Sequence, residues 1–133
     1  MHDTWSDLDR TLLLLASLAL ADDRVADLER EALAWVADAA VGVGEGDGGG
    51  DAESRVAWAL ELVRHEAEPI SFATRVASVM RPEQKRIVVR LCIALVQHDG
   101  TVTQTELQHL ADIATGLAMT QAEFTEIVEQ VTA

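Results

Sequence analysis

The sequence predicts an all-α protein, a single-domain bundle of about seven helices. Apolar residues recur at spacings of three and four along the 133-residue chain, and no segment shows the strict alternation of a strand. Hydrophobic residues make up 49%, yet the chain has no Tyr, only two Phe and three Trp, so its core is built from Ala, Leu and Val. That composition favours close-packed helices over a sheet. Most connections are short enough to join antiparallel neighbours.

The first half of the chain predicts two helices and a linker. The first helix spans 4–21, with Thr4 or Ser6 as its N-cap and an apolar run after residue 10. Eleven apolar residues are too few to span a bilayer, and the acidic segment before them does not suit a signal peptide, so we expect a buried helix. The second helix spans about 27–40. Residues 41–51 hold six of the eight glycines and predict a flexible linker, and their GxGxxG match is discounted because no strand precedes it.

Three further helices are expected before residue 98. One spans 52–67, one runs from Pro69 to about Met80, and one from Pro82 to about His98, because proline suits the first turn of a helix. Their expected inner residues are Val56, Leu60 and Val63, then Phe72, Ala73, Val76 and Met80, then Ile87, Val88, Leu91, Ala94 and Leu95. Cys92 lies in an apolar run and is interpreted as a small core residue in a reducing compartment.

Two capping boxes mark the last two helices. In this pattern a threonine hydroxyl and a glutamate three residues later each accept a hydrogen bond from a backbone N–H. Thr103 with Glu106 therefore predicts a helix that begins at Gln104, and Thr120 with Glu123 predicts the last one. The expected inner faces are Leu107, Leu110, Ile113, Ala114 and Leu117, then Phe124, Ile127, Val128 and Val131.

A shift of 77 residues aligns two parts of the chain. Asp99 then falls on Asp22 and Glu106 falls on Glu29, with apolar positions matching around them. The chain is therefore interpreted as two pseudo-repeated helix-turn-helix units, about 8–40 and 85–117. In each unit an acidic turn follows one helix and a glutamate lies at the start of the next.

The charge distribution limits the partners. The net charge is −13, which disfavours nucleic acid and anionic lipid. Residues 1–54 carry three basic and 13 acidic groups, residues 55–90 carry seven and four, and residues 91–133 carry none and six. Three interpretations of the basic middle stay open. Its residues Lys85, Arg86 and Arg90 contact an acidic partner, contact the protein's own acidic lobes, or form a face exposed to solvent.

The second acidic turn resembles the end of an EF-hand loop, but the first two ligand positions would be Leu95 and Gln97, so an EF-hand is disfavoured. A helix that ends in an acidic Asp-Gly turn and is followed by a hydrophobic residue and a glutamate, present twice in an all-helical chain, resembles the TerB-like tellurite-resistance family. That family is similar to the N-terminal domain of membrane DnaJ-like co-chaperones. Asp99, Gly100, Val102 and Glu106 match the motif, whereas the first copy has Asp23 in place of the glycine.

The resemblance implies a bacterial, cytoplasmic, stress-related domain without enzymatic activity. It also implies a role in protein assemblies, including membrane-associated stress assemblies without direct membrane insertion, and a homo-oligomer is compatible with it. Divalent-cation binding is attributed to the carboxylate-rich surface of such domains. Carried over to this chain, the candidate metal ligands are Asp22, Glu29, Asp99 and Glu106. If the copies meet about a pseudo-two-fold axis, these hard oxygens converge and suit Ca²⁺, Mg²⁺ or Mn²⁺.

Two alternative functions stay open at this stage. The first is a metal-free acidic scaffold that binds a basic partner surface, with Glu106 serving only as a helix cap. The second is a ferritin-like metalloenzyme, suggested by the E-x-x-H spacing of Glu106 and His109. That site needs a second E-x-x-H pair, and the position that matches His109 in the first unit is Ala32, so the metalloenzyme is disfavoured.

Overall fold

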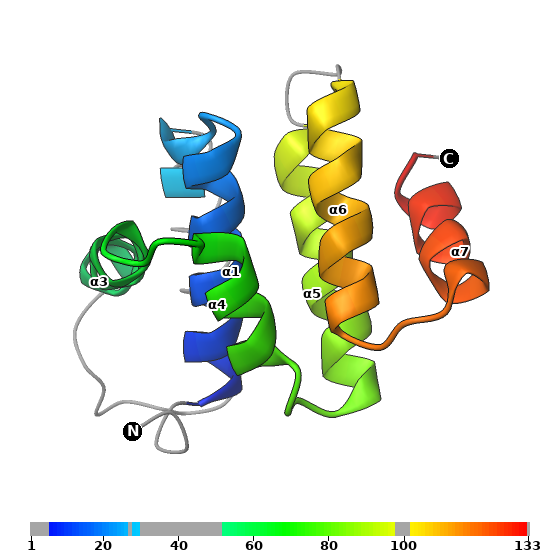
Figure 1. The fold of residues 1–133 in the computed structure, drawn as a ribbon, viewed down its shortest axis with the longest axis horizontal. Coiled ribbons are helices and arrows are strands. Elements are labelled where there is room, and N and C mark those ends of the chain that lie inside the picture. Colours follow the sequence, from blue (N-terminus) through cyan, green and yellow to red (C-terminus); the bar gives the residue numbers. More distant parts are fainter. Residues whose placement is uncertain (1–5, 27, 30–51, 98–101, 133) are drawn as a thin grey trace.

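The structure, a computed structural model, describes residues 6–26, 28–29, 52–97 and 102–132, and within these ranges it is all-helical. Its long helices are α1 (Asp7–Ala21), α3 (Ala52–Arg64), α4 (Pro69–Ala77), α5 (Pro82–Val96), α6 (Gln104–Gly116) and α7 (Gln121–Thr132) (Figure 1). The all-α prediction is confirmed. Most of the expected second helix and the linker at 41–51 lie outside the described residues.

Helix α1 is the central helix of the fold. Ser6 is its N-cap and forms a capping box with Asp9, with reciprocal N–H to side-chain distances of 3.1 Å. Every residue from Thr11 to Ala19 is buried, and α1 packs against α3, α4 and α5. The apolar run is therefore surrounded by protein. Among the described residues, no helix is long and apolar enough to cross a membrane.

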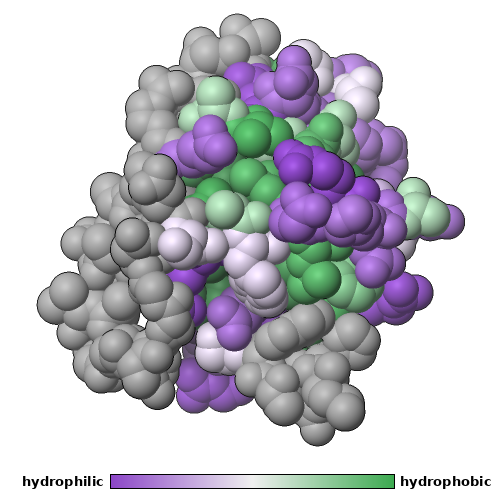
Figure 2. Space-filling view, turned by 90° about the vertical axis from the view of Figure 1, so that its left-hand side faces the viewer, coloured by the Kyte–Doolittle hydropathy of each residue, from purple (hydrophilic) through white to green (hydrophobic). Residues whose placement is uncertain are grey.

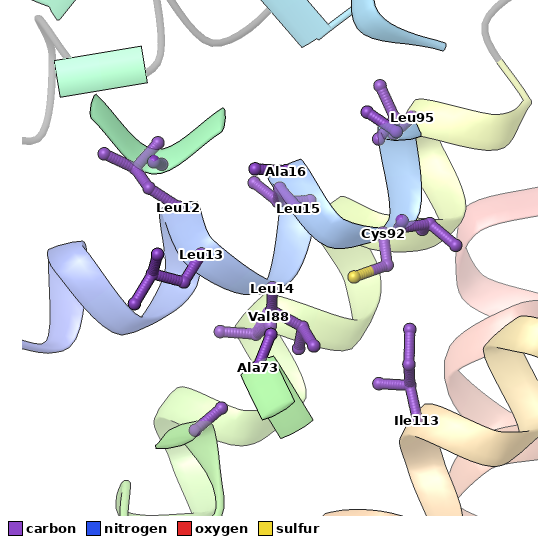
Figure 3. Packing of buried hydrophobic residues seen from close by; sticks show 14 of the residues in the cluster. Leu12, Leu13, Leu14, Leu15, Ala16, Ala73, Val88, Cys92, Leu95 and Ile113 are labelled. Carbon is purple, nitrogen blue, oxygen red and sulfur yellow. The ribbon is translucent and has the colours of Figure 1, made fainter. Parts of the chain in front are cut away.

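The aliphatic core predicted from composition is present. Buried side chains from α1, α4, α5 and α6 form one cluster (Figure 3). Cys92 lies fully buried in it, and burial raises the pKa of its thiol to about 12. The predicted inner faces of the third and fourth helices are buried as expected, although α4 ends at Ala77, before the expected Met80. On the α3 side of the molecule, hydrophobic side chains also form a band at the surface between hydrophilic ones (Figure 2).

Helices α5, α6 and α7 form the second half of the structure, with α6 antiparallel to the other two (Figure 1). Arg86 of α5 pairs with Glu123 and Glu126 of α7, at 3.2 and 2.6 Å. One turn further along α5, Arg90 donates to Gln130 at 3.1 Å. Three alternatives were open for the basic residues of α5. For Arg86, the structure shows contact with the protein's own acidic residues.

The predicted inner faces of α5 and α6 are wrong at three positions. Ile87 of α5 is 40% exposed and Ala94 is exposed, while Leu107 of α6 is 45% exposed. The buried face of α5 instead consists of Val88, Val89, Cys92, Ile93, Leu95 and Val96. Because α5 packs against α1, α6 and α7, the choice between two apolar stripes depends on where these neighbours lie.

Candidate functional site

The end of α1 forms a tight turn at the first acidic segment. Asp22 is the C-cap, and its N–H donates to Leu18 O at 3.0 Å. Asp23 then takes a left-handed conformation with φ 59°, and the Arg24 N–H reaches back to Ala19 O at 2.7 Å. This hydrogen-bond pattern ends many helices and favours glycine at the left-handed position. Asp23 therefore adopts the conformation expected of the glycine that the first repeat lacks.

The start of α6 is fixed by the predicted capping box. The Thr103 N–H donates to Glu106 Oε1 at 2.9 Å, and the Glu106 N–H donates to the Thr103 hydroxyl at 3.1 Å. The helix begins at Gln104, as predicted. Unlike most first-turn glutamates, Glu106 is buried, with only 3% of its surface exposed. A group in this position needs a charged partner from another part of the chain.

Two polar pairs join the end of α1 to α6. Arg24 Nε donates to Glu106 Oε2 at 2.8 Å, across 82 residues of sequence. His109 Nδ1 lies 2.8 Å from Asp22 Oδ1, across 87 residues. An ionised carboxylate can only accept a hydrogen bond, so Nδ1 is the donor in this pair. We call these four residues, Asp22, Arg24, Glu106 and His109, the α1–α6 corner.

The corner carries two buried acids with opposite pKa shifts. Burial is the main cause that raises the pKa of Asp22; His109 opposes this, and the negative charge of Glu106 adds to it. Burial also acts to raise the pKa of Glu106, but hydrogen bonds from Arg24 and Thr103 prevail and lower it. Arg24 thus stabilises the ionised form of Glu106. The two shifts show that the corner holds Glu106 firmly as an anion and Asp22 less firmly.

The structure brings two of the four predicted ligands together. Asp22 and Glu106 both belong to the corner, whereas Glu29 is exposed. Asp99 lies outside the described residues. Sequence reasoning missed the roles of Arg24 and His109. The signal for His109 was its i, i+3 spacing from Glu106, which places both side chains on one side of α6.

The comparisons with known proteins give the family. A model described as "Tellurite resistance protein TerB" matches residues 8–129, nearly the whole chain. The chain belongs to the TerB family. No curated protein and no solved structure matches it. The resemblance indicated by the acidic turns is therefore confirmed, and the α1–α6 corner is part of a tellurite-resistance-type domain.

A divalent cation at this corner of the TerB domain would need free oxygen ligands. Ca²⁺ takes six to eight of them, and Mg²⁺ requires octahedral geometry. Glu106 uses both oxygens, one for Thr103 and one for Arg24, and Asp22 Oδ1 accepts from His109. Of the four carboxylate oxygens of Asp22 and Glu106, Asp22 Oδ2 alone is buried without a hydrogen-bond partner among the described residues. In the same ranges, no group of three or more His, Cys, Asp or Glu could hold a metal ion. The described donors therefore fit an ion-paired corner better than a metal site.

Proposed function

We propose that this TerB domain is a non-enzymatic protein-interaction module of a cytoplasmic stress assembly, and that its acidic surface binds a basic surface of a partner protein. The α1–α6 corner supports this proposal because its carboxylates already have partners within the chain. They stabilise the fold, so the charges offered to a partner lie elsewhere.

The observation that carries the proposal is the charge of α6 and α7. Residues 91–133 contain no Lys or Arg, and Asp112 and Glu129 are exposed on these helices. The same segment exposes 45% of Leu107, an apolar residue that a partner can cover. We call the exposed acidic residues Asp112 and Glu129 the α6–α7 surface; Leu107 lies about 140° from Asp112 around the axis of α6 and is a separate exposed position. Charged groups at the rim of an interface mainly set association rate and specificity, while an apolar anchor adds affinity.

A charge-matched comparison tests this proposal. The variant Asp112→Asn/Glu129→Gln removes two charges from the α6–α7 surface. The control variant Glu66→Gln/Glu83→Gln removes one charge from the connection between α3 and α4 and one from the first turn of α5. Isothermal titration with a lysine-rich peptide measures the affinity of both variants. We expect about fivefold weaker binding for the first variant, from two rim charges of about 0.5 kcal/mol each. Equal losses in both variants would mean that only net charge matters, which would refute a defined surface.

A divalent-cation site at Asp22, Glu29, Asp99 and Glu106 is the second candidate function. Asp22 Oδ2 favours it, because a buried carboxylate oxygen without a hydrogen bond is costly and a cation would relieve that cost. Thermal melts with Ca²⁺, Mg²⁺ or Mn²⁺ at about 10 mM decide between the candidates, because a ligand that binds the native state raises the melting midpoint. A raised midpoint in the unmodified protein supports the cation site, and an unchanged midpoint supports the metal-free module.

A further inference from the structure

The Lys and Arg side chains of the described residues fall into two groups. Six arginines have an ion pair or a hydrogen bond with another side chain of the chain: Arg10, Arg24, Arg55, Arg64, Arg86 and Arg90. The side chains of Arg75, Arg81 and Lys85 have neither in the part of the chain that the structure describes. These three lie around the connection between α4 and α5, at the lower end of the bundle in Figure 1. The unpaired positive charge of the described ranges is therefore concentrated at this connection.

The same connection exposes an apolar side chain in a fixed position. After α4 ends, the Met80 N–H donates to Ala77 O at 3.0 Å, and the side chains of Ala77 and Met80 are buried. Val79, between them in the turn, is 70% exposed, the highest value among the large hydrophobic side chains of the described residues. The packing of its neighbours therefore holds Val79 toward solvent.

The helix ends on either side place the basic residues close to this turn. Arg75 is in the last turn of α4, four residues before Val79. Arg81 is the N-cap of α5, and the Lys85 N–H donates to Arg81 O at 2.9 Å. Residues four apart on a helix lie on one side of it, so Arg81 and Lys85 are neighbours at the start of α5.

The acidic residues of the same two helices leave these charges unneutralised. Glu83 is exposed in the first turn of α5, two residues from both Arg81 and Lys85, and residues two apart on a helix do not face each other. Glu68 lies at the opposite end of α4, where its Oε1 accepts from the Ser71 hydroxyl at 3.3 Å. A chain with a net charge of −13 thus keeps a local positive patch beside an exposed valine.

We propose that Arg75, Val79, Arg81 and Lys85 form a docking surface, the α4–α5 surface, for an acidic segment of a partner protein with an apolar side chain among its carboxylates. Charge complementarity selects the acidic segment, and Val79 provides the apolar contact. At physiological ionic strength, repulsion from acids farther than about 8 Å is largely screened, so a short segment responds to the local charge. An anionic membrane is disfavoured, because it would also face the surrounding negative surface. The domain then has two docking surfaces of opposite charge.

The test is an NMR titration of the ¹⁵N-labelled protein with the peptide Glu-Asp-Leu-Asp-Glu. A second peptide has Ser in place of Leu. The titration runs to about 10 mM peptide at about 50 mM NaCl, which suits the weak affinity of a small contact and limits screening. The variant Arg75→Gln/Arg81→Gln removes two charges from the α4–α5 surface. The control Arg64→Gln/Arg90→Gln removes two from exposed arginines that already have partners.

We expect saturable shifts at the amides of residues 75–85. Binding should be about fivefold weaker in Arg75→Gln/Arg81→Gln, from the loss of two exposed charge contacts, and unchanged in the control. The Ser-containing peptide, or Val79→Ser in the protein, should also weaken binding about fivefold, the effect of roughly 40 Å² of apolar surface left in water. All substituted residues are exposed, so circular dichroism should show that every variant folds.

Several results would overturn the inference. These are the absence of shifts at residues 75–85, equal weakening in the two double variants, and equal affinity for the two peptides. Sedimentation velocity and cosedimentation with phosphatidylserine vesicles test the other occupants. Self-association or vesicle binding that is lost in Arg75→Gln/Arg81→Gln would assign the surface to a second copy or to a membrane instead. The lysine-rich peptide should bind this variant at least as tightly as it binds the unmodified protein, so failure here is distinguishable from failure of the proposed function.

Discussion

Replacement of Glu106 by Gln separates the two roles of this residue, helix cap and buried ion-pair partner. Gln also serves in a capping box, so the cap alone predicts a small loss of stability. The ion pair predicts more, because the variant replaces the buried carboxylate that Arg24 Nε contacts at 2.8 Å by a neutral amide. Loss of one partner from a buried pair costs about 3–5 kcal/mol, and Gln recovers part of this because its carbonyl oxygen can still accept one of the two hydrogen bonds. We therefore expect a loss of about 2–3 kcal/mol.

The chain contains a matched control for this experiment. Glu123 forms the same capping box with Thr120, at 2.9 and 3.1 Å, and also pairs with an arginine, Arg86. Its side chain is 42% exposed, however, so solvent screens the pair. Glu123→Gln should hardly change the melting midpoint, whereas Glu106→Gln should lower it by about 7–10 °C, from the average unfolding entropy per residue.

The pH dependence provides an independent check. Because the pKa of Glu106 is lowered from 4.5 in the folded state, its stabilisation is present above that value and is lost as the pH falls through the folded-state pKa. The difference in midpoint between wild type and Glu106→Gln should therefore shrink in acid. Thermal melts from neutral pH to about pH 3 measure it. Equal losses for Glu106→Gln and Glu123→Gln at neutral pH would refute the reasoning, because burial would then have no effect.

Three other predictions concern the packing of the helices. Ala118 ends α6 in a left-handed conformation with φ 62°, so Ala118→Gly should raise the stability by about 1 kcal/mol in denaturant melts, whereas Ala111→Gly inside α6 should lower it. A Cβ at Gly116 would lie 2.3 Å from Thr74 Cγ2, so Gly116→Ala should lower the stability by about 1–2 kcal/mol. Thr74→Ser removes that methyl group, and in its presence Gly116→Ala should become neutral or stabilising. The buried Cys92 thiol, with its pKa raised to about 12, should resist iodoacetamide in the native state and react after guanidinium unfolding, as followed by mass spectrometry. Stabilisation by Ala111→Gly, tolerance of Gly116→Ala alone, or rapid native-state alkylation would contradict these predictions in turn.

Local signals in the sequence were enough to place most of the helices. Capping boxes act within four residues, so the start of α6 at Gln104 could be predicted to the residue. Proline at the first turn likewise marked the starts of α4 and α5. The three wrong inner positions, Ile87, Ala94 and Leu107, depend instead on the tertiary structure. An apolar residue at the edge of a helical stripe is buried only if a neighbouring helix covers it.

Local patterns in the sequence predicted the acidic residues of the candidate site but not their partners. The acidic turns and the first-turn glutamate are visible as a pattern, and they also carried the resemblance to TerB, which the family match confirms. The pattern predicted that the carboxylates of the two acidic turns converge on a divalent cation. In the structure Glu106 meets Arg24, and Asp22 meets His109. These partners lie 82 and 87 residues apart, and their pairing depends on the tertiary packing that brings the turn after α1 to α6.

The sequence by itself determined the all-helical class, the capped ends of the helices, the aliphatic core and the family of this protein, because these depend on local hydrogen bonding and on the periodicity of apolar residues. Only the tertiary structure decided which charges meet at the α1–α6 corner. Contact between side chains distant in the chain depends on the packing of whole helices, and a buried carboxylate is neutralised by whichever cationic group that packing brings within reach.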